Sequence, residues 1–498
     1  MHADQSTVTN ASHAQARQGS GSALAKGTRR TKIVCSYEGR MLDPGMAARL
    51  LEDDADSLRL VYNRDAGDRL AAFIKAFRAG ATSDRKRPSL MIDLAEGARG
   101  MIHNLEGPRE LNYGDVVTLG PIGSKETFQV NTKNWGVLFR AGATVFVGYG
   151  NVVLRTLETS TTKTTLEVLQ GGTVFPETDL HVPDTRSKPN LSELNIQEIR
   201  TFLASGVDHL VLPGVVDPSE VSRFRAELAA LKPAIPSIPW LILRVDSLAV
   251  YEELDRLLPA VDGVLISRRE MALSFNPATI PMITKEIIQR CNDQAKLALT
   301  ASEMLGSMRR NVTPTRAEVS DIANSVIDGT DGVVISEEVA HGKYAEQALQ
   351  VMRRIIGDVE ARTFEQPNWT KKAPTIVNEF DAISFAAYRT AERVNAKAIV
   401  CLTKAGNTAI RLASFRAPVP IVAVTFSPEV LRRLTLVSGV EGIVLDIDPK
   451  IDEVLPVVNE RLLRDSWLKA GDRIVFVSIS LSSMGRESSN LVTVQQLS

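Results

Sequence analysis

The sequence predicts an α/β protein with mainly parallel strands, and three features of its 498 residues support this class. Short apolar segments alternate with amphipathic helical segments from Leu191 to about residue 356, which is the pattern of strands joined by helices. The same alternation returns from residue 375 onward. Between about residues 99 and 185 the chain instead holds short alternating segments and turn residues, which indicates an inserted β domain.

The clearest helix–strand unit begins at Thr315, a predicted helix N-cap. Glu318, three residues later, completes a capping box. Apolar residues then follow at helical spacing until Gly329, where we expect the helix to end. Residues 332–335, Gly-Val-Val-Ile, form a short apolar strand of the kind that is buried in a βα barrel.

Composition excludes several classes of protein. Forty-four per cent hydrophobic and 23 per cent charged residues are ordinary for a soluble globular chain. The 58 basic and 59 acidic residues give a net charge of −1, which argues against a nucleic-acid or membrane binder that relies on bulk charge. No apolar run is long enough to span a bilayer. Three widely spaced cysteines, Cys35, Cys291 and Cys401, indicate a reducing compartment without a disulfide framework.

The N-terminal part divides into a tail and three strands. Residues 1–28 are rich in Ser, Thr, Ala, Gln and Gly and lack a hydrophobic period, so we predict a disordered extension. It lacks the apolar core of a secretory signal, and a weak transit peptide or an interaction tail are the alternatives. Strands are predicted at 31–36, 57–62 and 88–93, with a helix at about 44–53.

The C-terminal part reads as a separate α/β unit. A connector is predicted at residues 357–373. A helix at 381–395 then leads to a strand at 398–402, with further strands at 420–424 and 473–477. This order is typical of an open α/β sheet.

Several of these segments closely resemble the pyruvate kinase family. Residues 314–321 read PTRAEVSD, identical to a characteristic family pattern, and residues 31–35 read TKIVC, as in the family's first strand. The resemblance covers nearly the whole chain after residue 28. It implies a (β/α)8 TIM barrel with an inserted small β-barrel lid domain and a C-terminal open α/β sheet domain. The implied divisions are the extension 1–28, the barrel 29–98 and 186–356, the lid 99–185, the connector 357–373 and the C-terminal domain 374–498.

The resemblance also locates the family's catalytic positions. Arg244 stands where the family has the lysine that contacts the transferring phosphoryl group, and Arg59 matches its phosphate-binding arginine. Ser302 replaces a threonine near the proton-transfer end and keeps the hydroxyl. Arginine keeps the charge of lysine but changes its shape and reach, so we expect these catalytic positions to be vestigial.

Two carboxylates survive at the family's metal positions. Asp246 and Glu270 replace a glutamate and an aspartate, which leaves a Mg²⁺ or Mn²⁺ site open beside the alternative of a salt-bridged pair. Arg268 and Arg269 fall in the substrate-binding motif. Arg269 replaces a glycine whose backbone approaches the substrate carboxylate in the family, so its side chain is expected to fill the substrate's space.

The family's potassium ligands correspond to Val61, Asn63, Asp93 and Leu94. Two of these side chains are apolar and offer a cation no oxygen, so we expect potassium binding to be lost. Asp93 is then the remnant of a former potassium site.

Two further ligand regions differ from the family in opposite ways. On the nucleotide side, Ala95 and Gly100 replace a lysine and an arginine. In contrast, the stretch TKAGNT resembles the family's effector-phosphate loop TKSGRS. Its residues are Thr403, Lys404, Ala405, Gly406, Asn407 and Thr408. Backbone N–H groups at a helix N-terminus suit a phosphate, and an ordinary capped turn is the alternative.

The replacements affect the metal, potassium, substrate and nucleotide positions together, while packing and capping segments are kept. From this pattern we expect a catalytically silent relative that serves as a structural or scaffold subunit of a larger assembly. A cytoskeletal or ciliary assembly is a guess without residue support. Two alternatives stay open, namely a divergent active pyruvate kinase that transfers phosphate from phosphoenolpyruvate to ADP, and a phosphometabolite-binding sensor.

Expectations for partners and cofactors follow from the same resemblance. We expect protein partners, in a homo- or hetero-oligomer of pyruvate kinase type or a larger assembly, and neither nucleic acid nor membrane. No cofactor is expected, and Mg²⁺ and K⁺ would be needed only if activity is retained. The expected location is cytoplasmic, with the cytoskeleton as the same guess.

Overall fold

The computed structural model describes most of the chain. It describes residues 29–37, 45, 47–49, 55–62, 67–80, 88–94, 100–130, 139–148, 150, 152–175, 178–182, 191, 196–232, 234–301, 304–340, 342–365, 378–445, 451–478 and 490–498. The predicted extension 1–28 lies outside these residues, as does most of the helix predicted at 44–53.

Eight parallel strands close into a barrel. The strands are β1 (Lys32–Tyr37), β2 (Ser57–Val61), β3 (Ser89–Asp93), β13 (His209–Leu212), β14 (Trp240–Val245), β15 (Gly263–Ser267), β16 (Leu297–Ala301) and β17 (Gly332–Ile335). Their order around the barrel follows the chain, and β1 pairs with both β2 and β17 to close the ring. The predicted fold class is confirmed.

Helices surround the barrel. They are α2 (Gly67–Gly80), α4 (Ile196–Ala204), α5 (Pro218–Ala230), α6 (Leu248–Glu252), α7 (Leu254–Leu257), α8 (Arg268–Met271), α9 (Ile280–Asp293), α10 (Arg316–Ile327), α11 (Glu337–Ala340) and α12 (Ala345–Glu365). Helix α12 continues to Glu365 because apolar residues such as Ile355 and Ile356 keep its helical period. The first half of the predicted connector is therefore helical.

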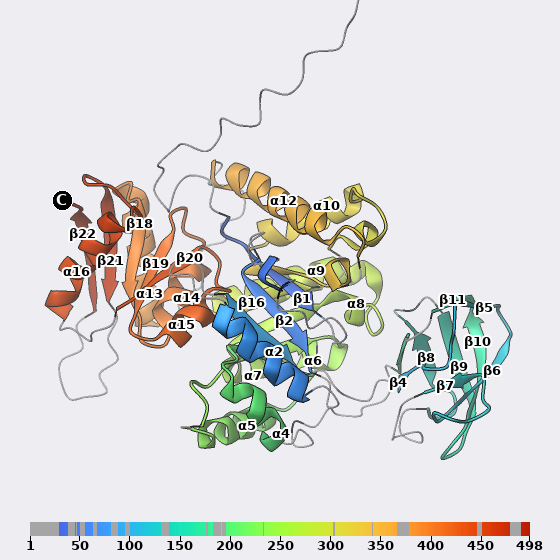
Figure 1. Ribbon diagram of the computed structural model, residues 1–498. Coiled ribbons are helices and arrows are strands. Elements are labelled where there is room, and N and C mark those ends of the chain that lie inside the picture. The colour runs from blue at the N-terminus through green and yellow to red at the C-terminus, as the bar shows by residue number, and fades with distance from the viewer. Residues whose placement is uncertain are drawn as a thin grey trace, which may run out of the picture.

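Two further domains flank the barrel on opposite sides in Figure 1. The lid carries β4 (Gly100–Met101), β5 (Arg109–Leu111), β6 (Val116–Gly120), β7 (Phe128–Gln129), β8 (Thr144–Val147), β9 (Val152–Thr159), β10 (Thr164–Gln170), β11 (Gly172–Val174) and β12 (Asp179–His181). The C-terminal domain carries α13 (Glu379–Arg393), β18 (Ala398–Leu402), α14 (Asn407–Ser414), β19 (Ile421–Thr425), α15 (Pro428–Leu434), β20 (Val440–Val444), α16 (Ile451–Arg464), β21 (Arg473–Ser478) and β22 (Leu491–Gln496).

Successive residues of each barrel strand enter different cores, because side chains alternate along a strand. Ile33 and Cys35 of β1 pack outward against the helices. Val34, between them, points into the barrel with Met91 and Ile242, and this inner cluster continues into the core of the C-terminal domain. The barrel interior is therefore a packed core, and any site must lie at its rim.

An aspartate precedes every second barrel strand. The four are Asp56, Asp208, Asp262 and Asp331. Each carboxylate accepts the N–H of a residue in the adjacent strand at 2.8–2.9 Å, and each aspartate N–H donates to the carbonyl of that same residue. The paired residues are Ile33, Leu90, Leu241 and Ala298. This fourfold repeat fastens the strands in pairs at the end of the barrel opposite the site.

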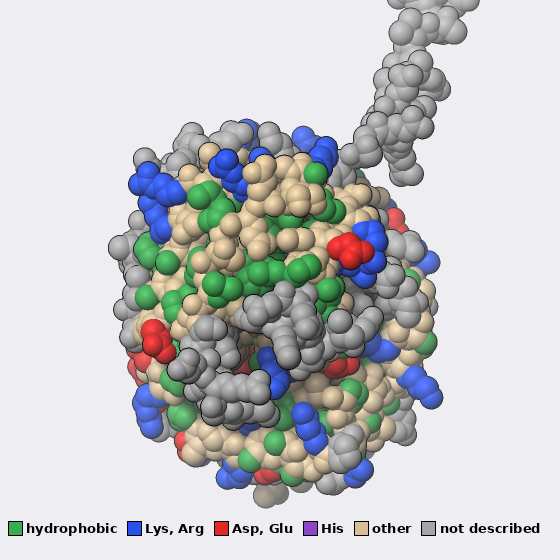
Figure 2. Space-filling model, turned by 90° about the vertical axis from the view of Figure 1, so that its left-hand side faces the viewer, with side chains coloured by type: hydrophobic (Ala, Val, Ile, Leu, Met, Phe, Trp, Pro, Cys, Tyr) green, Lys and Arg blue, Asp and Glu red, His purple; other side chains and the backbone are tan. Residues whose placement is uncertain are grey.

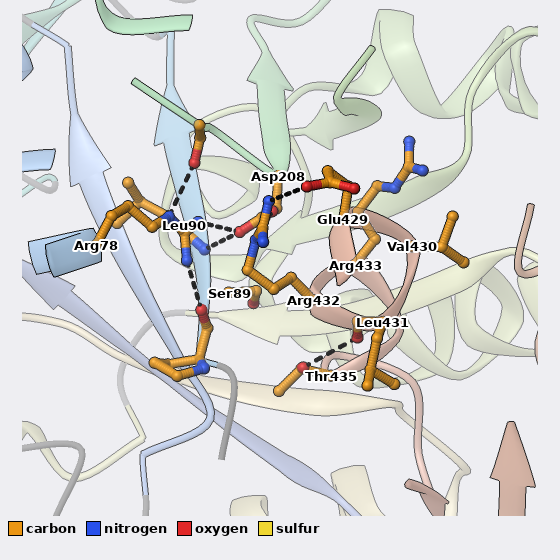
Figure 3. A network of polar contacts seen from close by, with 12 residues as sticks. Arg78, Ser89, Leu90, Asp208, Glu429, Val430, Leu431, Arg432, Arg433 and Thr435 are labelled. Atoms are coloured by element: carbon orange, nitrogen blue, oxygen red, sulfur yellow. Dashed lines mark hydrogen bonds and ion pairs between the residues drawn. The ribbon is translucent and has the colours of Figure 1, made fainter. Parts of the chain in front are cut away.

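Two of these aspartates also hold the C-terminal domain. Asp208 pairs with Arg78 of α2 on one side and accepts from Arg432 Nε of α15 at 3.0 Å on the other (Figure 3). Asp331 accepts from Arg416 Nη1 at 2.7 Å and from the N–H of Ser438 at 3.1 Å. The C-terminal domain is therefore docked on the N-terminal ends of the barrel strands.

The outer face of the C-terminal domain carries exposed hydrophobic side chains (Figure 2). Figure 2 views this side of the molecule, and hydrophobic side chains gather across its middle. Strand β22 lies at the edge of the five-stranded sheet, and its Val494 is 43 % exposed. Among the described helices, none combines the length and apolar composition that a bilayer-spanning segment requires.

Candidate functional site

Three predicted site residues, one each from the potassium, catalytic and substrate-binding positions, lie at the C-terminal rim of the barrel. Asp93 ends β3, Arg244 is the next-to-last residue of β14, and Arg268 follows β15 directly. Parallel strands bring their carboxyl ends to one rim, which is where barrel enzymes place their chemistry. The structure thus brings Asp93 into contact with Arg244, which lies 151 positions further along the sequence.

Asp93 is the centre of this cluster. Its carboxylate is fully buried, and its Oδ2 atom accepts from Arg244 Nη2 at 2.5 Å and from Arg59 Nε at 3.0 Å. Arg59 Nη2 also donates to the same oxygen, and Arg59 Nη1 donates to Ser36 Oγ at 2.6 Å. One carboxylate oxygen therefore receives three N–H groups from two guanidinium groups.

The charges in the cluster hold one another ionised. Burial alone would raise the pKa of Asp93, but the charges and hydrogen bonds of Arg244 and Arg59 hold that pKa below its usual range. Burial would likewise lower the pKa of Arg244, which Asp93, Glu270 and Asp246 together raise above its usual value. Arg244 is thus a fixed cation that faces three carboxylates.

The two predicted metal ligands lie in the field of Arg244. Asp246 closely approaches the backbone, since a Cβ added to Gly214 would come within 2.6 Å of its Oδ1 atom. Mg²⁺ is typically held by one or two carboxylates together with waters and substrate phosphates, so the donor chemistry of Asp246 and Glu270 fits it. Within the described ranges no three His, Cys, Asp or Glu side chains converge as a closed metal cage.

The potassium positions do not fit a monovalent cation. Leu94 is fully buried and, like Val61, offers no side-chain oxygen, while Asp93 Oδ2 already receives three N–H groups. The Ser36 hydroxyl is engaged by Arg59 Nη1 and lies 3.2 Å from Ser336 Oγ. The family's potassium site is therefore absent from the described residues in a form that potassium could use.

The two substrate-motif arginines are held by acidic residues of helices α10 and α11. Arg268 Nη1 lies 3.4 Å from Asp321 Oδ2 on α10, and Arg269 Nη1 donates to Glu337 Oε1 on α11 at 2.5 Å. Arg309 pairs with the second oxygen of Glu337. Arg269 thus has a carboxylate partner beside the barrel mouth, a contact that its sequence position alone does not reveal.

Helix α10 has the predicted capping box. The Thr315 hydroxyl accepts from the N–H of Glu318 at 3.3 Å, and the N–H of Thr315 donates to the Glu318 carboxylate at 2.7 Å. The same carboxylate accepts from the N–H of Ser307 at 2.6 Å and from its hydroxyl. One glutamate therefore caps the helix and also holds Ser307, which lies between β16 and α10.

Sequence reasoning missed two acidic residues of the rim, Glu337 and Glu338. Glu338 is 4 % exposed, and its carboxylate accepts the N–H groups of Leu305 at 3.0 Å and Ser336 at 2.9 Å. Both residues follow the buried strand β17 after Ser336, and this placement at the strand's carboxyl end was the signal that could have found them.

The predicted effector loop lies on the other end of the barrel, away from this cluster. Thr403 Oγ1 is buried and accepts from the N–H of Gly406 at 3.0 Å, while Lys404, Ala405 and Asn407 are exposed. Gly406 has φ 101°, and a Cβ there would meet Trp240 Cζ2 at 3.1 Å. This close approach to the first residue of β14 explains the glycine.

Some predicted positions cannot be placed. Ser302, Asn63 and Ala95 lie outside the described residues. Gly100 is the first residue of the lid strand β4.

Comparison with protein families gives two matches that together span most of the chain. Residues 28–349 match the model described as "Pyruvate kinase, barrel domain". Residues 381–495 match the model described as "Pyruvate kinase, alpha/beta domain".

Individual relatives agree with these matches. A protein named pyruvate kinase from Staphylococcus aureus is 28 % identical over 458 residues, which are 90 % of this chain and 77 % of that protein. The crystal structure of a pyruvate kinase from Cryptosporidium parvum is similar in fold, with a TM-score of 0.77 and 23 % identity over 94 % of this chain and 96 % of that chain. The same organism's enzyme in complex with ADP gives a TM-score of 0.80 and 24 % identity over 95 % and 96 %.

These findings correct the expected function. The prediction of a catalytically silent scaffold subunit is wrong, because relatives named pyruvate kinase match nearly the whole chain. No comparison supports the cytoskeletal or ciliary guess. The error has a physical origin, since the prediction gave more weight to lost residue identity than to retained charge. Arg59 and Arg244 keep two cations at the rim, and Asp246 and Glu270 keep two carboxylates.

Proposed function

Because the chain belongs to the pyruvate kinase family, we propose that it is an active, divergent pyruvate kinase that transfers a phosphoryl group from phosphoenolpyruvate to ADP. The observation that carries the proposal is Arg244 Nε, a buried N–H with no acceptor among the described residues. Buried donors nearly always have a partner, so an orphaned one at a barrel rim favours an absent acceptor such as a phosphoryl oxygen.

The charge distribution suits phosphoryl transfer. In the reaction, an oxygen of the terminal ADP phosphate bonds to phosphorus, the phosphorus–oxygen bond of the enol phosphate breaks, and its electron pair stays on the enol oxygen. Negative charge is spread over the transferring group throughout, so catalysis depends on positioned positive charge. Arg244 supplies that charge on a rigid strand, and Arg59 is held beside it through Asp93.

Asp93 has a positioning role in this proposal. It binds both guanidinium groups through one oxygen and so fixes the separation of the two cations. A guanidinium that is already oriented loses little freedom when it binds a phosphoryl oxygen. Arginine in place of lysine is then compatible with phosphoryl transfer, because Asp93 already orients the guanidinium group before the substrate binds.

Asp246 and Glu270 are the residues that would hold Mg²⁺, which when bound neutralises phosphate charge. Arg244 limits the mutual repulsion of these two carboxylates. Ser302 is assigned to the proton-transfer end, where the enolate carbon must gain a proton to give pyruvate. Its hydroxyl can donate or relay that proton.

We also propose that the chain forms a homo-oligomer and works in the cytoplasm. The exposed edge strand β22 and its Val494 favour pairing with a second copy, because an unpaired strand edge is a template for association. All three cysteines are buried and free, which suits a reducing compartment. Light scattering of the protein and of Val494→Lys tests the assembly, and a monomer in both would contradict it.

Direct binding tests the proposed substrate. Calorimetric titration with phosphoenolpyruvate in the presence of Mg²⁺ should give saturable binding that Arg244→Gln weakens at least tenfold, about 1.4 kcal/mol. Arg256→Gln is the matched control, because Arg256 is 70 % exposed on α7 and pairs only with Glu253 at the surface. Absence of binding by the unaltered protein would contradict the proposal.

A further inference from the structure

The cluster around Asp93 contains a cation of its own. Two guanidinium groups converge on one buried carboxylate oxygen at the point where the family binds potassium. Arg244 is 3 % exposed and Asp93 is fully buried, so ions in solution have little access to either side chain. Both guanidinium groups share the Asp93 carboxylate, and Arg244 also lies in the field of Asp246 and Glu270.

A potassium ion would find neither ligands nor a favourable field here. Potassium needs several oxygen donors, and Val61 and Leu94 provide none from their side chains. Two nearby oxygens, Asp93 Oδ2 and Ser36 Oγ, already accept guanidinium N–H groups. A like charge about 4 Å away costs about 4 kcal/mol near a protein surface, and two guanidinium groups would each impose such a penalty.

We infer that Arg244 replaces the monovalent cation, so that this chain binds phosphoenolpyruvate and turns it over without potassium. The inference rests on the proposed function, because it concerns the same site. Arg244 is attached to strand β14, so its positive charge is always present at the site. A potassium ion supplies its charge only while it is bound. Its buried Nε–H additionally offers a donor, which potassium lacks.

A potassium ion and a guanidinium group also differ in the directions from which they bind oxygen atoms. Potassium attracts oxygens from any side, whereas a guanidinium group donates its hydrogen bonds in its own plane. We therefore expect the site to respond to the shape of the cation as well as to its charge. Arg244→Lys should keep the charge but leave part of the guanidinium space empty, and Arg244→Met should remove the charge while keeping an unbranched apolar chain.

The experiment compares salts at matched ionic strength. The full-length protein is assayed for pyruvate formation and for thermal midpoint in potassium chloride and in tetramethylammonium chloride, and thallous ion is titrated as a potassium probe observed by its NMR signal. We expect the same rate and midpoint in both salts and no bound thallous ion. A potassium-dependent rate, or saturable thallous binding that potassium displaces, would overturn the inference.

Variants separate this inference from the proposed function. Arg244→Met removes one of the two cations on Asp93 and should lower turnover in both salts without binding thallous ion, because Val61 and Leu94 still offer no side-chain oxygen. Arg256→Met is the control for nonspecific salt effects, since Arg256 lies on the exposed surface. If the unaltered protein shows no turnover in either salt, the proposed function fails, yet the thallous titration still decides whether the cation site exists. If Arg244→Met does not fold, the titration of the unaltered protein decides alone.

Discussion

Arg244 Nη2 donates to Asp93 Oδ2 at 2.5 Å, and both side chains are almost completely buried at the rim of the barrel. Neither residue type is unusual, but the pairing gives both of them their function. Burial would lower the pKa of Arg244, but Asp93, Glu270 and Asp246 raise it, while burial would raise the pKa of Asp93 and Arg244 and Arg59 hold it down. A substitution at either position therefore acts on both.

Asp93→Asn is expected to destabilise the protein strongly. The change removes the one carboxylate that Arg59 and Arg244 share, and breaking a buried ion pair on one side costs about 3–5 kcal/mol. Urea denaturation measures the loss. Asp255→Asn is the matched control, because Asp255 is 70 % exposed and forms a surface ion pair with Arg290 at 3.5 Å. This variant should lose less than about 1 kcal/mol of stability. Equal losses in the two variants would contradict the role of Asp93.

The fold could be predicted because its signals are local. The capping box at Thr315 and Glu318 and the apolar strand after it are contiguous in sequence, and the structure has both. The fourfold aspartate repeat was missed, although each aspartate directly precedes an apolar run. Its meaning depends on adjacent strands such as β3 and β13, which lie more than 100 residues apart and cannot be paired from periodicity.

The sequence identified residues of the cluster around Asp93 but not the hydrogen bonds between them. Asp93, Arg244 and Arg59 were all identified, yet as separate departures from a family pattern. Their shared hydrogen bonds join residues 34 and 151 positions apart, and no spacing rule connects such distances. Arg269 was expected to fill the substrate's space, and the structure gives it Glu337 as a partner. The direction of a side chain depends on such partners, and the sequence alone does not show which distant residues become neighbours.

Asp208→Asn should loosen the C-terminal domain from the barrel. The variant loses the ion pairs with Arg78 and Arg432 together, at a cost on the order of 3 kcal/mol for a buried aspartate. Calorimetry should then resolve two unfolding transitions in place of one. Asp262→Asn is the control, because its arginine, Arg225, belongs to barrel helix α5. Two transitions in both variants, or in neither, would contradict the domain-docking role.

The domain interface should weaken in mild acid through His209. Burial lowers the pKa of this imidazole from 6.5 to about 4, against the opposing field of Asp208 and with a smaller contribution from Arg433. The unfolded chain therefore binds a proton between these values that the folded chain does not bind. The stability from this group is complete above about pH 6.5 and is lost as the pH falls towards 4, by about 3 kcal/mol in all.

Denaturation by urea at about pH 7 and about pH 5 measures this loss. His209→Gln is the control, because its amide can donate to the carbonyl oxygen of Arg433, which lies 3.3 Å from His209 Nε2. The variant should lose less stability between the two pH values than the unaltered protein. An identical loss in both would show that other groups cause the acid sensitivity.

Pyruvate formation from phosphoenolpyruvate and ADP, measured on the purified protein with Mg²⁺, tests the central claim most directly. The account predicts ADP-dependent turnover in the range of about 1–100 per second that is typical of phosphoryl-transfer enzymes. It also predicts that Arg244→Gln reduces this turnover by at least about a hundredfold, while Arg256→Gln leaves it unchanged. No pyruvate above the uncatalysed rate, from protein that is folded and supplied with both substrates, would contradict the account.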